Sequence, residues 1–84
     1  MAEWVTSAVT KAGPAVENSN INVQLRALEG QFAGPRWYVA AAPVKKEMLA
    51  TALTAITTGL HVNAFLEGLT EYETLLRLYV SRED

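Results

Sequence analysis

The order in which two hydrophobic periodicities follow each other constrains the fold of this chain more than any other feature. Four segments alternate apolar and polar residues at period two, which is typical of half-buried strands, and a fifth apolar segment alternates more weakly. One segment repeats instead at the helical period. We predict a helix over residues 44–58 and strands at about 4–11, 20–28, 36–42, 60–66 and 72–81.

Three strands, one helix and two strands are the elements of a five-stranded Greek-key barrel of the oligonucleotide/oligosaccharide-binding (OB) type. In that fold, the helix between strands three and four closes one open end of the barrel. A ferredoxin-like fold needs two helices, and an up-and-down barrel leaves the helix unexplained. The predicted fold class is therefore mainly β with one helix, order β-β-β-α-β-β, as one OB-type domain spanning residues 1–84.

The alternation also predicts which residues face outward. On the second strand, Asn22, Gln24 and Arg26 share the polar face. On the third, Arg36, Tyr38 and Ala40 are expected on the outward face, and Trp37, Val39 and Ala41 on the opposite face. The run Ala12-Gly13-Pro14 is expected to end or bend the first strand, and Gly59 to end the helix in the left-handed conformation.

Size and composition favour self-association. A domain of 84 residues without cysteine has a marginal core and no disulfides to support it. One face of the helix is apolar and consists of Val44, Met48, Leu49, Ala52, Leu53, Ala55 and Ile56. The other face is mostly threonine, whereas a helix face in contact with water more naturally carries charged residues. Strand five is apolar on both faces, with Leu76, Leu78 and Val80 on one face and Leu75 and Tyr79 on the other. We therefore predict an oligomer interface at Thr51, Thr54, Thr58, Phe65, Leu75 and Tyr79; the alternative is a broad helical plug beside a strongly curved sheet.

A ligand surface is predicted on strands two and three, the usual binding face of an OB barrel. Aromatic rings stack on sugars or bases, and arginine binds acidic groups. The candidate ligand-binding residues are Asn22, Gln24, Arg26, Arg36 and Tyr38. The alternative is that Trp37 is a core residue and the other residues form an ordinary solvated face. Trp4 is expected to pack rather than to bind a ligand.

Several classes of function are disfavoured by the sequence. The formal net charge is -2 and the seven basic residues are scattered, which argues against a nucleic-acid binder. His61 lacks neighbours at metal-ligand spacing, and neither a nucleophile motif nor a glycine-rich phosphate loop is present. We expect no enzymatic activity, no cofactor and no membrane span, and the N-terminus lacks the features of a signal peptide.

The stretch APVKKEMLATALTAITTGLHVNAFLEGLTEYETLLRLYV resembles the second half of the pentameric B subunits of bacterial A–B toxins of the cholera, Shiga and pertussis types. The likeness is closest at the junction of helix and strand, ALTAITTGLHVNAFL. The same stretch also looks like small bacterial proteins of undefined role. The resemblance implies a pentameric ring with helices around a central pore and sugar-binding surfaces on one face. Many secreted members carry a disulfide, which this chain lacks, and no glycan-binding residue of the family is matched here.

These observations lead to one functional hypothesis and two alternatives. The hypothesis is a non-enzymatic, homo-oligomeric binding protein, similar to the toxin B subunits, with a glycan or a protein as partner. The alternatives are a purely structural assembly subunit and a monomeric OB-type binder of single-stranded nucleic acid. The resemblance favours an exported protein, whereas a native start at Met1 would fit a cytoplasmic one.

Overall fold

The computed structural model describes residues 2–15 and 20–81. Strands β1 (Glu3–Ala15), β2 (Asn20–Ala27) and β3 (Pro35–Ala40) are followed by a short 3-10 turn, η1 (Ala42–Val44), and by helix α1 (Lys45–Thr58). Strands β4 (His61–Leu66) and β5 (Thr74–Ser81) complete the described chain. Apart from η1, this order matches the predicted one.

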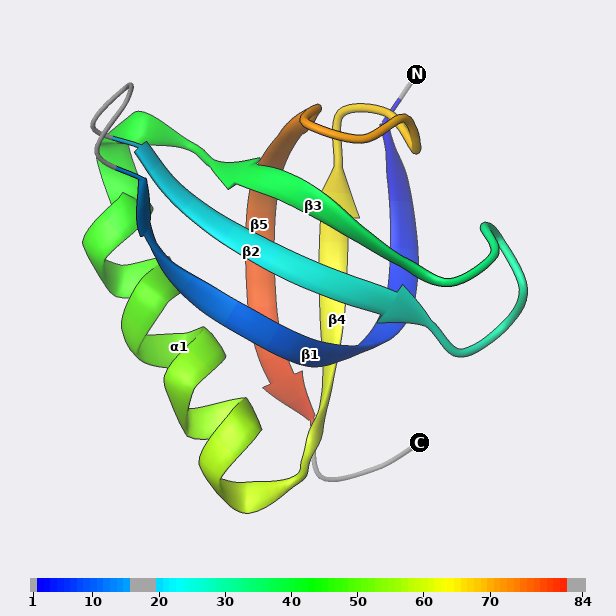
Figure 1. Ribbon diagram of the computed structural model, residues 1–84, viewed down its shortest axis with the longest axis horizontal. Coiled ribbons are helices and arrows are strands. Elements are labelled where there is room, and N and C mark those ends of the chain that lie inside the picture. The colour runs from blue at the N-terminus through cyan, green and yellow to red at the C-terminus, as the bar shows by residue number, and fades with distance from the viewer. Residues whose placement is uncertain (1, 16–19, 82–84) are drawn as a thin grey trace.

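The five strands form one sheet that closes in a ring, in the order β1-β2-β3-β5-β4 (Figure 1). Closure is possible because β1 is long enough to pair with two strands. Its first half pairs with β4, its second half pairs with β2, and Ser7 has a partner in both. All pairs are antiparallel except β3 with β5.

The expectation that β1 ends or bends at Ala12-Gly13-Pro14 was wrong about its end. The strand continues to Ala15, with Gly13 opposite Asn22 and Pro14 opposite Ile21. Proline lacks a backbone donor and is therefore tolerated best where a strand has a partner on one side only. This half of β1 pairs with β2 alone, which accommodates Pro14.

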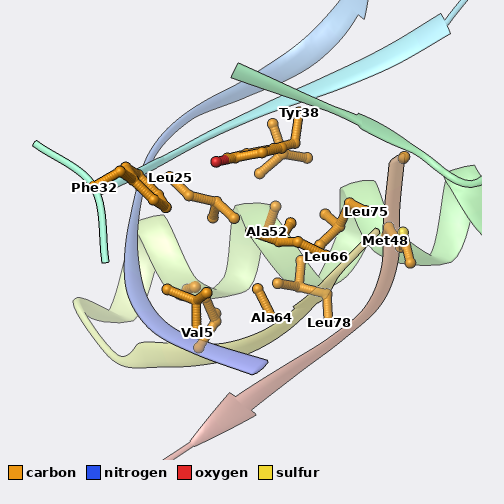
Figure 2. Packing of buried hydrophobic residues seen from close by; sticks show 14 residues of the cluster. Val5, Leu25, Phe32, Tyr38, Met48, Ala52, Ala64, Leu66, Leu75 and Leu78 are labelled. Atoms are coloured by element: carbon orange, nitrogen blue, oxygen red, sulfur yellow. The ribbon is translucent and has the colours of Figure 1, made fainter. Parts of the chain in front are cut away.

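The core fills the inside of the ring and the face of α1 that lies against it (Figure 2). Helix α1 packs against β1, β2, β3 and β5 and buries Met48, Ala52 and Ala55. Phe32, from the loop between β2 and β3, also enters the core, with its ring centroid 5.8 Å from that of Tyr38. The small alanine side chains allow α1 to lie close to the sheet.

The predicted facing of β3 is inverted in the structure. Tyr38 is completely buried and points into the core (Figure 2). Ala40 is buried on the same face. The cause is the register of the sheet, since residues paired across antiparallel strands lie on the same face. Tyr38 is opposite the buried Val23, whereas Trp37 is opposite Gln24 on the outer face.

The predicted facing of β5 is corrected as well. Leu75 was expected on the face opposite Leu78, but both are buried. The register with β4 shifts between Phe65 and Leu66, which pair with Arg77 and Leu75, so that Leu76 is an extra residue on β5. Such a β-bulge changes the phase of the alternation. Leu75 is thus a core residue and is not available for an oligomer interface.

Only part of the predicted apolar face of α1 is buried. Leu53 and Ile56 remain 46% and 41% exposed, and Val44 is 38% exposed. The helix ends as predicted: Gly59 adopts the left-handed conformation with φ 74°, and its amide donates to the carbonyl oxygen of Ala55.

Candidate functional site

A groove runs between α1 and β5 on the outside of the ring. It consists of two adjoining hollows that share Thr51, Leu78 and Tyr79. We call it the α1–β5 groove; its other lining residues are Val44, Glu47, Met48, Ala50, Thr54, Leu76, Arg77 and Val80. The structure thus brings three predicted interface residues, Thr51, Thr54 and Tyr79, to one surface.

The threonine side chains of α1 satisfy their hydroxyl groups within the helix. The hydroxyls of Thr51, Thr54 and Thr58 donate to the backbone carbonyls of Glu47, Ala50 and Thr54, at 3.0, 3.0 and 2.7 Å. A hydroxyl that already has an acceptor loses less on leaving water. The threonine face is therefore less costly to bury against a partner than its composition implies. Thr58 is exposed at the end of the helix and does not line the groove.

An aromatic cluster lies on the outer face of β1, β4 and β5 and adjoins the groove through Tyr79. The ring of Trp4 is 4.8 Å from that of Phe65 and 5.9 Å from that of Tyr79, measured between centroids. The guanidinium of Arg77 lies 5.8 Å from the centre of the Phe65 ring. Trp4 and Tyr79 are about half exposed, at 48% and 53%. Trp4 packs against other side chains, as expected, but it does so on the outer surface, beside the predicted interface residues Phe65 and Tyr79.

A third hollow, separate from the groove, lies on the outer face of β1, β2 and β3, and we call it the Trp37 pocket. It has a volume of about 300 Å³ and is lined by Lys11, Ala12, Gly13, Pro14, Asn22 and Trp37. Gly13 stands opposite Asn22 in the sheet, and the absence of a side chain at Gly13 leaves the space open. Next to it, the Thr10 hydroxyl donates to the side-chain oxygen of Gln24 at 2.7 Å and fixes that amide.

The five predicted ligand residues do not form one surface. Asn22 lines the Trp37 pocket, and Gln24 lies beside it, opposite both Lys11 and Trp37. Arg26 is exposed further along β2 and does not line the pocket. Arg36 and Tyr38 are instead directed to the loop between β4 and β5, and we remove Tyr38 from the candidate surface because it is buried.

The sequence reasoning identified Asn22 but missed five pocket residues: Lys11, Ala12, Gly13, Pro14 and Trp37. Trp37 and Val39 had been assigned correctly to one face of β3, but the alternation could not say whether this face was inside. No signal within β3 itself distinguishes its two faces, and only the pairing with β2, where Tyr38 is opposite the buried Val23, decides between them.

Arg36 and Tyr38 both bind the carbonyl oxygen of Leu69, through Nη1 at 2.8 Å and the phenol hydroxyl at 2.6 Å. The guanidinium of Arg36 also lies 4.9 Å from the centre of the Phe32 ring. Burial raises the pKa of the Tyr38 hydroxyl above its ordinary value of 10.0, although the positive charge of Arg36 opposes this shift. These contacts stabilise the fold, and the polar groups that make them are largely unavailable to a ligand.

Within residues 2–15 and 20–81, no three histidine or carboxylate side chains lie close enough together to hold a metal ion. In the same part of the chain, no helix is both long and apolar enough to pass through a membrane. Comparison with protein families, with curated protein sequences and with solved structures found no match to this chain.

Proposed function

We propose that this chain is a non-enzymatic, OB-type binding subunit that assembles with copies of itself into a ring, as pentameric toxin B subunits do, and that binds a carbohydrate. The strand order β1-β2-β3-β5-β4 supports an OB-type barrel, as does the position of α1 between β3 and β4. The observation that carries the assembly is that α1 presents two different surfaces beside its buried stripe.

The first surface is the α1–β5 groove, with Thr51 and Thr54 on its helical side and Tyr79 on its strand side. The second contains Leu53 and Ile56, which are exposed and do not line the groove. Successive residues of a helix are about 100° apart around its axis. Leu53 and Ile56 therefore lie on one side of the buried stripe formed by Met48, Ala52 and Ala55, and the groove lies on the other side.

Two distinct surfaces on opposite sides of one element suit a head-to-tail contact, in which the groove of one copy receives the Leu53 and Ile56 surface of the next. Such contacts close into rings when the rotation between copies allows it, whereas a twofold dimer uses one surface twice. Leu53 and Ile56 are already more than half buried, so burying the rest of each side chain would contribute about half of the roughly 1.5 to 3 kcal/mol that full burial gives.

The assembly is tested by the mass in solution, measured by light scattering after size exclusion. A pentamer has five times the 9.2 kDa mass of the chain. Thr54→Glu places a charge in the groove and is expected to give monomers, as is Ile56→Glu on the second surface. Thr70→Glu, in the exposed loop between β4 and β5, makes the same chemical change away from α1 and should leave the mass unchanged.

Mixing the two monomeric variants distinguishes a head-to-tail contact from a twofold one. Each variant keeps one intact surface, so Thr54→Glu and Ile56→Glu together should form a heterodimer but no larger species. A monomeric wild-type chain would refute the proposed assembly. An Ile56→Glu variant that still forms dimers alone would refute the head-to-tail arrangement and indicate contact between two grooves.

A further inference from the structure

The outer surface around Trp37 combines an aromatic side chain with a recess that the sheet register creates. Trp37 is opposite Gln24 on β2, and Asn22, two residues before Gln24, is opposite Gly13 on β1. Because residues paired across strands share a face, a side chain at Gly13 would stand over Asn22. With glycine there, the space above Asn22 stays open and reaches Trp37.

The polar groups around this recess are not all satisfied. The side-chain oxygen of Asn22 is withdrawn from solvent and has no hydrogen-bond partner within the described chain. An acceptor in that state is costly, and a donor in the recess reaches it once a rotation of the side chain turns the oxygen into the recess that Asn22 lines. Lys11 lines the same recess, and its ammonium group carries donors only. The amide of Gln24 beside it is already held by Thr10.

We propose that the Trp37 pocket binds one pyranose unit of a carbohydrate. A pyranose ring has an apolar C–H face that can pack on an indole, and hydroxyl groups that both donate and accept hydrogen bonds. In this arrangement the ring packs on Trp37, one hydroxyl donates to the Asn22 oxygen, and another accepts from Lys11. The pocket volume of about 300 Å³ is at the lower end of the range for small-molecule sites, which fits one sugar ring.

A sugar fits these residues better than a phosphate-bearing ligand does. Among residues 2–15 and 20–81, the only cationic residue that lines the pocket is Lys11. Recognition of phosphates relies on arginine forks or on several charges, and both arginines of the predicted ligand set lie outside the pocket. The inference rests on the proposed carbohydrate binding but not on the proposed assembly, because all the lining residues belong to one chain.

Titration of the ¹⁵N-labelled chain with methyl glycosides of glucose, galactose and N-acetylglucosamine, and with sialic acid, tests the pocket by NMR at up to tens of millimolar ligand. Shifts of the Trp37 indole N–H and the Asn22 side-chain amide are expected, while the Trp4 indole N–H stays in place. Comparing the affinity for sialic acid with the affinities for the neutral glycosides shows whether Lys11 selects an acidic sugar. No saturable shift at Trp37 with any of these ligands would overturn the proposal.

Three variants locate the binding site. Gly13→Val fills the recess and should abolish binding; a Cβ at this position meets no atom within 4 Å and the glycine backbone is not left-handed, so the fold should tolerate it. Asn22→Ala should weaken binding about tenfold through the loss of one hydrogen bond. Arg26→Ala, on the same face of β2 but outside the pocket, should bind as the wild type does.

The proposal fails if Gly13→Val and Asn22→Ala bind the sugar as tightly as the wild type, or if Arg26→Ala loses binding as they do. Light scattering on the same samples tests the proposed assembly separately from the proposed sugar site. A monomer that binds sugar in the Trp37 pocket would reject only the assembly. A ring whose saturable shifts lie away from Trp37 would reject only the pocket, whereas a ring with no saturable shift would reject the proposed carbohydrate binding as well.

Discussion

The hydroxyl of Tyr38 donates a 2.6 Å hydrogen bond to the carbonyl oxygen of Leu69, in the loop between β4 and β5. Beside it, the amide of Tyr72 donates to the carbonyl of Trp37 at 2.7 Å, and the amide of Trp37 donates to the Glu71 carboxylate at 3.2 Å. The parallel pairing of β3 with β5 includes only two residue pairs. The loop between β4 and β5 therefore contributes much of the connection that closes the ring.

Tyr38→Phe removes one hydrogen bond from this connection and should lower the free energy of unfolding by about 1 kcal/mol. The loss stays modest because the Leu69 carbonyl keeps Arg36 as a donor and is not left without a partner. Urea unfolding followed by circular dichroism measures the change. Tyr72→Phe removes a hydroxyl from an exposed tyrosine of the same loop and should have almost no effect. Equal effects of the two variants would contradict the importance of the Leu69 contact.

Alkaline pH should destabilise the fold through Tyr38. Burial raises the pKa of its hydroxyl above 10.0 in the folded chain, so above pH 10 the unfolded chain releases a proton that the folded chain still holds. The stabilising contribution is fully present below pH 10 and is lost as the pH rises from there through the folded-state pKa. Thermal unfolding across this range should show a steeper fall for the wild type than for Tyr38→Phe. Parallel curves would contradict the prediction.

The β-bulge in β5 predicts that alanine substitutions at two neighbouring leucines lower the free energy of unfolding by different amounts. Leu75 is completely buried, and Leu75→Ala should lower the free energy of unfolding by about 2 to 5 kcal/mol because it leaves a cavity. Leu76 is the extra residue and is only partly buried, so Leu76→Ala should cost clearly less. Chemical unfolding of both variants measures the difference. A larger cost at Leu76 would contradict the register of β4 and β5.

The elements could be predicted from the sequence because their signals are local. The period-two alternation of β2 and the glycine at position 59 each depend on residues that are neighbours in the chain. The candidate site was harder to predict, since it combines β1, β2 and β3. Asn22 was identified from its own strand, but Gly13 and Lys11 join it only through the register of β1 against β2.

By itself, the sequence determined the number, type and order of the elements, along with the alternation within each strand. Only the tertiary structure decided which face of β3 is inside, where β5 shifts its phase and how far β1 continues beyond Gly13. The physical reason is that alternation defines two faces without distinguishing them. Tyr38 became a core residue and Trp37 a surface residue when β3 paired with β2, whose buried Val23 and Leu25 set the inner face for both strands.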